Sequence, residues 1–276
     1  MAEFADKVVW ITGASSGIGE ALARVFSKHG AHIILSGRRV DALNAVAADL
    51  KTDTLVLPFE STDYNALPAR VSDAWSWKGR VDVLVNNAGV SQRSLAIETA
   101  PEVYRDLIDI DLIAPIWLTQ LQLPHMVEAG GGRIVAISSV AGRIGAPLRT
   151  AYCAAKHGLI GYMDALRAEV DALHNIKVTN VLPGSVATNV SRNALTADGS
   201  TRGRSDAVID AGDDPTDCAR AIVDAVAADA PELVFAKGQE LEATTLRHAD
   251  PDAFFQLIGA MGRQAVERHR AETDEP

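Results

Sequence analysis

At 276 residues, the chain is long enough for one α/β domain with a substantial core, and its 47% hydrophobic and 22% charged residues are ordinary for a globular enzyme. A formal net charge of −10 argues against a nucleic-acid partner, because the phosphates of nucleic acids attract a basic surface. The two cysteines, Cys153 and Cys218, have no CxxC spacing, so they support neither a disulfide framework nor a zinc site, and no metal is expected.

Short apolar runs, rich in β-branched residues, alternate with helical patterns along the chain. These runs are 8–12, 32–36, 54–57, 81–86, 133–138, 177–182 and 233–235. The alternation predicts a single α/β domain over 1–276, a doubly wound parallel sheet of about seven strands with helices on both faces. In such a sheet, ligands bind at the carboxyl ends of the strands.

A glycine-rich turn follows the first run, where residues 12–19 read TGASSGIG before a helical pattern begins. Glycines between a strand and a helix let the backbone approach a pyrophosphate, and the N-terminus of the helix faces the anion. The turn therefore predicts a dinucleotide site, although its spacing is TGxxxGxG and not the commoner GxGxxG. The residues expected at the cofactor here are Gly13, Ser15, Ser16, Gly17, Ile18 and Gly19.

The end of the second run bears on which dinucleotide binds. An acidic residue at this point would hold the 2′-hydroxyl of the NAD ribose, but the sequence LSGRR over 35–39 has Gly37 there. Arg38 offers a planar donor fork that suits a phosphate, which favours NADP(H) over NAD. The alternative is that Arg38 and Arg39 only begin a solvated helix. Arg39 is interpreted as a surface residue that could also stack beside the adenine.

Ser139, Tyr152 and Lys156 form the main catalytic candidate. Tyr152 and Lys156 lie four residues apart and therefore share one face of a helix. A phenol is a poor acid or base at neutral pH, and a nearby ammonium group favours the phenolate. With a serine hydroxyl aimed at the same point, the three suit proton transfer at a carbinol carbon beside a hydride carrier. Each residue taken alone has a plain structural explanation.

Five motifs, in order, resemble those of the short-chain dehydrogenase/reductase family over most of the chain. They are TGASSGIG at 12–19, NNAG at 86–89, the serine of ISSVAG at 137–142, YxxxK at 152–156 and PGSVAT at 183–188. The resemblance implies a Rossmann-like fold. It also implies that Tyr152 is the general acid when a ketone is reduced, that Lys156 binds the nicotinamide ribose and that Ser139 polarises the carbonyl. The cofactor residues that it adds are Asn87, Ala88, Gly89, Tyr152, Lys156, Pro183, Gly184, Val186 and Thr188.

Two positions depart from the family's pattern. In a helix expected over 101–128, Asp111 stands where the family often has an asparagine, which acts largely through its backbone carbonyl in a water relay to the lysine. A carboxylate there would favour the charged form of Lys156 and could pair with it. The outcome is either a working relay with an altered pH profile or a crippled one. Glu60 stands where the family often has an aspartate near the adenine, and its greater length puts that role in doubt.

Three further expectations concern the periphery of the site. The polar, irregular segment 188–214 is predicted to be a substrate lid, and 271–276 a flexible tail. The resemblance implies a homodimer or homotetramer. No apolar stretch approaches the roughly 20 residues that span a bilayer, and 1–6 is not a signal peptide, so we expect a cytoplasmic protein with no membrane partner.

The resulting hypothesis is an NADP(H)-dependent oxidoreductase that transfers a hydride between nicotinamide and a ketone, aldehyde or secondary alcohol. Residues 188–212 are similar to a branch of broad-substrate and orphan carbonyl reductases. The alternatives are a 3-oxoacyl thioester reductase and a non-catalytic NADP(H) sensor. The substrate would be anionic if Arg93, Arg143 and Arg149 face inward, and lipophilic if Leu148 and the lid supply apolar walls.

Overall fold

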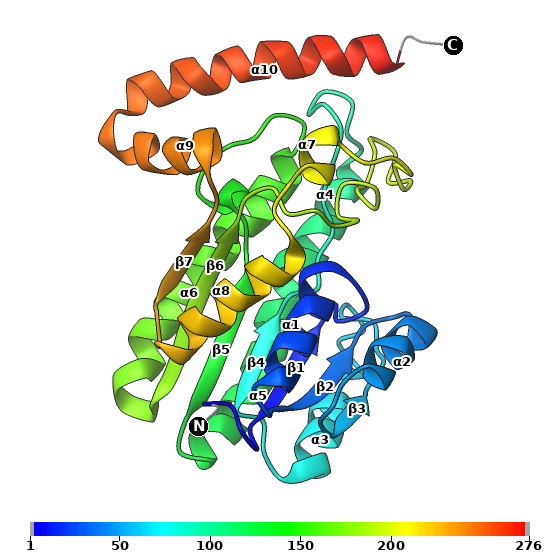
Figure 1. Ribbon diagram of the computed structural model, residues 1–276. Coiled ribbons are helices and arrows are strands. Elements are labelled where there is room, and N and C mark those ends of the chain that lie inside the picture. Colours follow the sequence, from blue (N-terminus) through cyan, green and yellow to red (C-terminus); the bar gives the residue numbers. More distant parts are fainter. Residues whose placement is uncertain (1–2, 274–276) are drawn as a thin grey trace.

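The computed structural model describes residues 3–273, and in this part of the chain seven strands form one parallel sheet (Figure 1). The strands are β1 (Val8–Thr12), β2 (His32–Ser36), β3 (Thr54–Val56), β4 (Val83–Asn86), β5 (Gly132–Ile137), β6 (Ile176–Pro183) and β7 (Glu232–Phe235). Their order is β3-β2-β1-β4-β5-β6-β7, so the sheet winds outward in both directions from the pair of β1 and β4. The predicted doubly wound sheet is therefore confirmed. Its ligand crevice is expected at the carboxyl ends of these two strands.

Helices cover both faces of the sheet. The helices of the described residues are α1 (Gly17–Lys28), α2 (Val40–Ala48), α3 (Leu67–Lys78), α4 (Pro101–Ile108), α5 (Ala114–Glu128), α6 (Thr150–His174), α7 (Ala207–Asp210), α8 (Pro215–Ala227), α9 (Gly238–Ala249) and α10 (Pro251–Thr273), with a π-helical turn η1 (Asp109–Ile113) and a 3-10 turn η2 (Val140–Gly142). One apolar core joins the sheet to α1, α2 and α8, and a second joins it to α3, α5 and α6. The molecule therefore has three layers, with the sheet in the middle.

The strand β1 shows why these runs form central strands. All five of its residues are buried, and alternate side chains enter opposite cores: Val9 and Ile11 one of them, Val8 and Trp10 the other. The one polar atom that Trp10 brings is satisfied, because its Nε1 donates a 2.8 Å hydrogen bond to Ser36 Oγ. A strand buried on both faces needs a continuous apolar run, which is the pattern seen in the sequence.

The helix predicted over 101–128 is in fact divided into α4, η1 and α5. The π-helical geometry is visible at the end of η1, where Ala114 N donates to the carbonyl of Asp109. Pro115 gives a physical reason for the division, because a proline has no N–H to donate to the carbonyl four residues earlier, here that of Asp111. The turn leaves the side chain of Asp111 fully buried.

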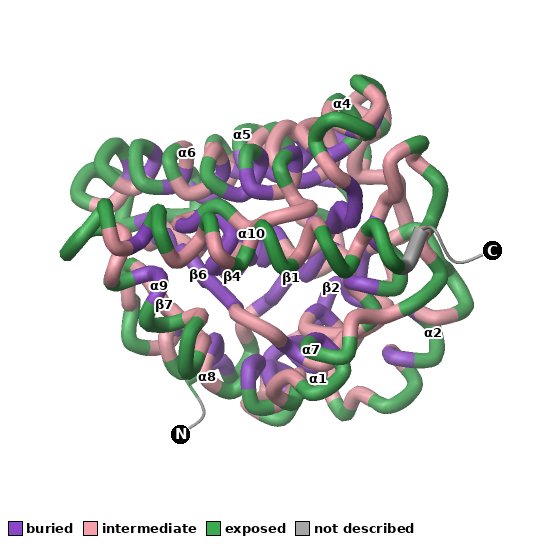
Figure 2. The backbone as a smooth tube through the Cα atoms, turned by 90° about the horizontal axis from the view of Figure 1, so that it is seen from above, coloured by how far each residue is buried: buried purple, intermediate pink, exposed green. Residues whose placement is uncertain are grey.

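The C-terminal helix α10 crosses above the carboxyl ends of the strands, from α9 toward α4, as the two views agree (Figures 1 and 2). Phe254 anchors it in a small core with Ile144 and Ala243, and His269 Nε2 lies 3.3 Å from Glu98 Oε2. Residues 271–273 belong to this helix, whereas a tail was predicted over 271–276; residues 274–276 lie outside the described residues.

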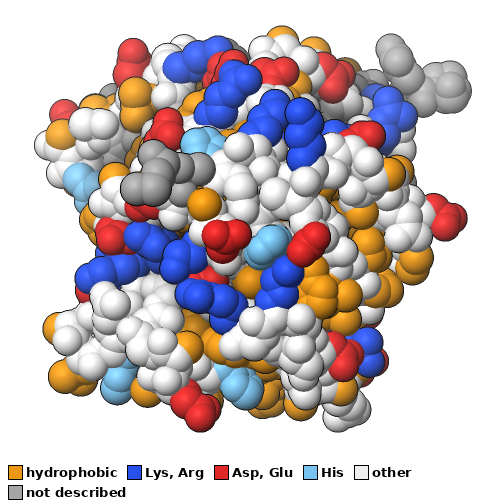
Figure 3. Space-filling model, turned by 60° about the horizontal axis from the view of Figure 1, so that its bottom comes forward, with side chains coloured by type: hydrophobic (Ala, Val, Ile, Leu, Met, Phe, Trp, Pro, Cys, Tyr) orange, Lys and Arg blue, Asp and Glu red, His pale blue; other side chains and the backbone are white. Residues whose placement is uncertain are grey.

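The amino-terminal edge of the sheet comes forward in Figure 3, where basic and acidic side chains lie next to one another. Arg133 Nε lies 2.8 Å from Asp229 Oδ1, and Lys78 Nζ lies 2.7 Å from Asp53 Oδ2.

No helix among residues 3–273 combines the length and the apolar character needed to cross a bilayer.

Candidate functional site

A cleft of about 660 Å³ opens at the carboxyl ends of the strands and brings the sequence motifs together. The predicted site residues that line it are Gly13, Ser15, Ser16, Gly17, Ile18, Arg38, Glu60, Asn87, Ala88, Gly89, Asp111, Ser139, Tyr152, Lys156, Pro183, Gly184, Val186 and Thr188. Gly19 lies behind the wall, where an added Cβ would come 2.4 Å from the carbonyl oxygen of Gly13. Its role is therefore to let the helix approach the turn.

The glycine turn is shaped for close backbone approach. Gly13 and Gly17 have φ values of 64° and 60°, in the left-handed region that favours glycine. A Cβ on Gly13 would lie 2.8 Å from the Cα of Ala88, and one on Gly17 would lie 3.1 Å from Cγ2 of Thr188. The turn thus meets the NNAG and PGSVAT segments directly, and the N-terminus of α1 opens into the cleft, where it can bind an anion.

Asn87 fastens the NNAG segment to this turn. Its Nδ2 donates hydrogen bonds of 2.9 and 3.2 Å to the carbonyls of Thr12 and Gly13. The backbone N–H groups of Asn87 and Ala88 both donate to Thr12 Oγ1 at 3.0 Å. A threonine at the end of β1 therefore holds two segments that a bound dinucleotide would contact.

Two arginines lie at the far end of the cleft, beyond the glycine turn. Arg38 Nη1 is 3.4 Å from Glu60 Oε2, and both side chains are largely exposed, so the pair contributes little to stability. Arg39 Nη2 donates 3.0 Å hydrogen bonds to the hydroxyls of Ser15 and Ser16. Arg39 was interpreted as a surface residue; it is exposed, but it belongs to the wall of the cleft.

The three catalytic candidates come from two elements. Ser139 lies two residues after the end of β5 and caps the N-terminus of η2, where its Oγ accepts a 3.1 Å hydrogen bond from Ala141 N and lies 3.4 Å from the carbonyl oxygen of Pro183. Tyr152 and Lys156 lie one turn apart on α6, with Lys156 Nζ 5.6 Å from the centre of the Tyr152 ring. All three line the same cleft, so a hydroxyl, a phenol and an ammonium group can act on one substrate.

Lys156 and Asp111 form a buried ion pair at the base of the cleft. Lys156 Nζ lies 3.2 Å from Asp111 Oδ2 and donates a 3.1 Å hydrogen bond to the carbonyl of Ile137. Asp111 Oδ1 accepts a 2.8 Å hydrogen bond from Val90 N. Burial is the largest effect and lowers the pKa of Lys156, but the attraction of Asp111, with a smaller contribution from Tyr152, leaves that pKa above its ordinary value. Burial raises the pKa of Asp111, and Lys156 opposes this rise.

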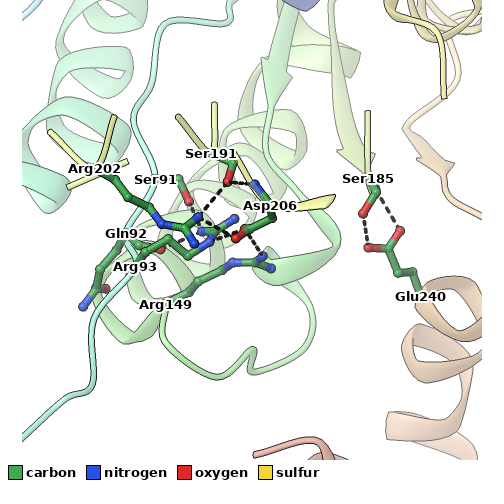
Figure 4. Close-up of polar contacts among 9 residues, drawn as sticks. All are labelled: Ser91, Gln92, Arg93, Arg149, Ser185, Ser191, Arg202, Asp206 and Glu240. Atoms are coloured by element: carbon green, nitrogen blue, oxygen red, sulfur yellow. Dashed lines mark hydrogen bonds and ion pairs between the residues drawn. The ribbon is translucent and has the colours of Figure 1, made fainter. Parts of the chain in front are cut away.

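The segment 188–214 forms part of the cleft wall through Val190, Leu195 and Ile209, and it contains the short helix α7. Asp206, at the N-terminus of α7, receives three guanidinium groups (Figure 4). Arg93 Nε lies 2.6 Å from Asp206 Oδ2, Arg202 binds Oδ1, and Arg149 Nη2 lies 3.8 Å from Oδ2. These residues form the Asp206 cluster (Arg93, Arg149, Arg202 and Asp206).

Burial is the main cause that lowers the pKa of Arg93, to about 10, so this arginine stays charged at neutral pH. Burial would raise the pKa of Asp206, but the attraction of Arg93 and the hydrogen bonds that it accepts from Arg202 and Arg93 lower it well below its ordinary value.

The arginines near the mouth therefore bind the protein itself. Arg93 and Arg149 contact Asp206, and Arg143 pairs with Glu232. None of these three arginines lines the cleft, and each has a carboxylate partner, so the condition set for an anionic substrate is not met. The side chains that segment 188–214 contributes to the cleft include both apolar and polar ones, the latter being Thr188, Asn189, Asn193 and Thr201.

Comparison with known proteins gives a consistent result. Residues 7–199 match the short chain dehydrogenase family. A "Dehydrogenase/reductase SDR family protein 7-like" from Anopheles gambiae is 40% identical across 91% of this chain and 82% of its own length. "Dehydrogenase/reductase SDR family member 7" from Homo sapiens is 37% identical across 99% of this chain and 82% of its own length.

Solved structures of short-chain dehydrogenases have the same fold. The crystal structure of a short-chain dehydrogenase from Streptomyces avermitilis superposes with a TM-score of 0.81 at 30% identity, covering 94% of this chain and 98% of that one. A short-chain dehydrogenase/reductase from Burkholderia phymatum, in complex with NAD, also has a TM-score of 0.81, at 22% identity over 92% of this chain and 96% of its own. This second likeness concerns the fold alone.

Proposed function

Because the chain belongs to the short-chain dehydrogenase/reductase family, a family of nicotinamide-dependent oxidoreductases, we propose that it is an NADP(H)-dependent enzyme acting on a ketone, an aldehyde or a secondary alcohol. The observation that carries the proposal is the presence of Ser139, Tyr152 and Lys156 in one cleft with the glycine turn. The fit of a dinucleotide is supported by the left-handed Gly13 and Gly17, which line the cleft and shape the turn at the N-terminus of α1, where a pyrophosphate can bind.

When bound, the nicotinamide supplies the hydride for reduction or accepts it in oxidation. The residues of the chain handle the proton and the charge. Tyr152 gives a proton to the carbonyl oxygen as the substrate is reduced, and Ser139 Oγ hydrogen-bonds the same oxygen. Lys156 keeps a positive charge beside the Tyr152 ring, which favours the phenolate left behind.

Arg38 and Arg39 support NADP(H) as the cofactor. Both line the end of the cleft next to Gly37, where a carboxylate would repel a 2′-phosphate. Two guanidinium groups there can bind a phosphate through paired N–H donors. The exposed, 3.4 Å contact of Arg38 with Glu60 is weak enough for a phosphate to replace.

The substrate that we propose is a neutral, lipophilic carbonyl compound. Val90, Val190, Leu195 and Ile209 contribute apolar side chains to the cleft, and burying apolar surface favours binding by about 25 cal/mol per Å². An anionic substrate such as an acyl-carrier thioester with acidic groups finds less support, because the arginines near the mouth already contact carboxylates.

Consumption of NADPH and NADH with a panel of ketones, aldehydes and diketones tests the proposal, with Tyr152→Phe as the control. We expect turnover that prefers NADPH and falls by about 10²- to 10⁴-fold in the variant, the usual contribution of an acid or base. If the wild type and Tyr152→Phe bind the cofactor equally well and neither turns over any compound of the panel, the non-catalytic sensor is favoured instead.

We also propose a homodimer or homotetramer in the cytoplasm. The outer helices α5 and α6 expose apolar side chains at Trp117, Val127 and Leu173, which a second copy could cover. Light scattering after size-exclusion chromatography gives the mass; a monomer at micromolar concentration would contradict the assembly.

A further inference from the structure

Glu240, in the first turn of α9, binds the loop between β6 and the lid. Its Oε2 accepts a 2.8 Å hydrogen bond from the backbone N–H of Ser185, and its Oε1 accepts a 2.8 Å hydrogen bond from the Ser185 hydroxyl (Figure 4). Both carboxylate oxygens thus act on one residue, which fixes the position and the direction of the contact. A bidentate, charge-assisted contact of this kind is more directional than a single hydrogen bond.

The carboxylate also fits closely against Gly184. A Cβ at Gly184 would lie 2.2 Å from Glu240 Oε2 and 3.1 Å from Ala236 Cβ. A side chain at position 184 would push the Glu240 carboxylate out of this place, so the contact with Ser185 requires a glycine there.

The loop that Glu240 contacts, residues 183–188, forms part of the wall of the cleft. Pro183, Gly184, Val186 and Thr188 line the cleft on both sides of Ser185 in sequence. Thr188 in turn meets the glycine turn, since a Cβ on Gly17 would lie 3.1 Å from its Cγ2. Pro183 lies beside the catalytic candidates, because Ser139 Oγ is 3.4 Å from its carbonyl oxygen. A shift of Ser185 would therefore move the wall of the cleft next to its reacting end.

Backbone hydrogen bonds hold the same loop from two other places. Gly184 N donates to the carbonyl of Phe235 at 2.9 Å, and Ala187 N donates to that of Asp213 at the same distance. Asp213 N donates to the carbonyl of Ser185 at 3.0 Å. Glu240 adds a side-chain contact to these, and it does so from the C-terminal part of the chain, beyond the residues 7–199 that match the family.

We propose that Glu240 is a positioning residue, which holds the 183–188 loop in the shape that receives the nicotinamide end of the cofactor. Through it, the C-terminal helices α9 and α10 contribute to cofactor binding as well as covering the site. The inference rests on the proposed function, because it concerns the same cofactor. Glu240 acts through Ser185 and touches neither substrate nor the reacting atoms.

The test compares Glu240→Ala and Glu240→Gln with Glu242→Ala, a matched control at an exposed position on the same helix. Glutamine can keep both contacts, because its carbonyl accepts from Ser185 N and its amide donates to the Ser185 hydroxyl. Hydrogen exchange of the protein without cofactor measures the loop directly, NADPH titration by fluorescence gives Kd, and steady-state kinetics separate KM from kcat.

We expect Glu240→Ala to accelerate exchange in peptides covering 183–188 and to weaken NADPH binding by about tenfold, the loss typical of a hydrogen bond to a charged group. Glu240→Gln and Glu242→Ala should both stay within about twofold of the wild type. Ser185→Ala should weaken NADPH binding less than Glu240→Ala, and the double variant should lose less than the sum of the two single losses.

Equal exchange rates and equal NADPH affinities in Glu240→Ala and Glu242→Ala would overturn the proposal, as would a lower melting temperature without either change. Its failure is distinguishable from failure of the proposed function. If the wild type binds NADPH but turns over no substrate, exchange and affinity still decide the role of Glu240. If the wild type binds neither NADPH nor NADH, both proposals fall.

Discussion

Lys156 Nζ lies 3.2 Å from Asp111 Oδ2, and the two side chains are 5% and 0% exposed. The sequence alone suggested that a carboxylate at position 111 could pair with the lysine, and the structure brings the two together. Burying an ion pair has a large desolvation cost, which is offset only when the remaining donors and acceptors are satisfied. Here Val90 N satisfies Asp111 Oδ1 and the carbonyl of Ile137 accepts from Lys156, whereas Asp111 Oδ2 accepts no hydrogen bond and has the ion pair as its polar contact.

The first prediction concerns Asp111→Asn. The attraction of Asp111 raises the pKa of Lys156, so the amide should let Lys156 lose its proton at a lower pH. We expect the alkaline limb of the kcat/KM profile to move to lower pH. Activity near neutral pH should stay within about tenfold of the wild type, because the acid/base residue is unchanged. An inactive but folded variant would mean that the carboxylate has chemistry of its own.

The second prediction concerns stability. Lys156→Met leaves the fully buried Asp111 without its cation, so we expect the free energy of unfolding to fall by about 3–5 kcal/mol in urea titrations. The double variant Lys156→Met/Asp111→Asn removes both charges, keeps an acceptor for Val90 N and should recover most of this loss. A double variant no more stable than the single one would show that the loss comes from packing.

Much of the fold could be predicted because its signals are local. Each strand is a short apolar run, and the order of strands and helices places the ends of parallel strands at one edge. Because ligands bind at this edge, the sequence already predicted that TGASSGIG and YxxxK lie in the same site. The division of the helix at 109–113 was missed, although Pro115 was a signal for it.

The contacts that fasten the loops to one another could not be predicted. Asp206 and Arg93 are 113 residues apart, and Glu240 and Ser185 are 55 apart. Both acids stand in polar sequence, where a charged residue is ordinarily solvated. Only the tertiary structure decides which carboxylates meet which partners. Arg39 is a partial exception. The sequence shows an arginine pair directly after the second strand, but it does not reveal that Arg39 binds the hydroxyls of Ser15 and Ser16.

The third prediction concerns cofactor choice. Arg38→Ala and Arg39→Ala should each weaken NADPH binding by about tenfold, since each removes charge-assisted hydrogen bonds to a phosphate, and should leave NADH binding nearly unchanged. Fluorescence titration with both nucleotides measures this. Arg70→Ala removes another surface arginine, one paired with Asp73, and serves as the control. Parallel losses for NADPH and NADH would contradict a 2′-phosphate site.

The last prediction concerns the Asp206 cluster. Asp206→Asn removes the charge that three guanidinium groups share, among them Arg93, which is only 7% exposed. A buried cation without its counter-charge is unfavourable, so we expect segment 188–214 to detach more often. Trypsin should then cleave at Arg192 and Arg202 several-fold faster, and KM for the carbonyl substrate should rise while kcat changes less.

The pH dependence has a definite sign. The pKa of Asp206 is lowered in the folded protein, so its contribution to stability is present above the ordinary pKa of an aspartate and is lost as the pH falls through the lowered value. Segment 188–214 of the wild type should therefore stay attached from neutral to mildly acidic pH. Asp210→Asn, at an exposed position of α7, is the matched control. If Asp210→Asn accelerates cleavage as much as Asp206→Asn, the arginine contacts do not hold segment 188–214.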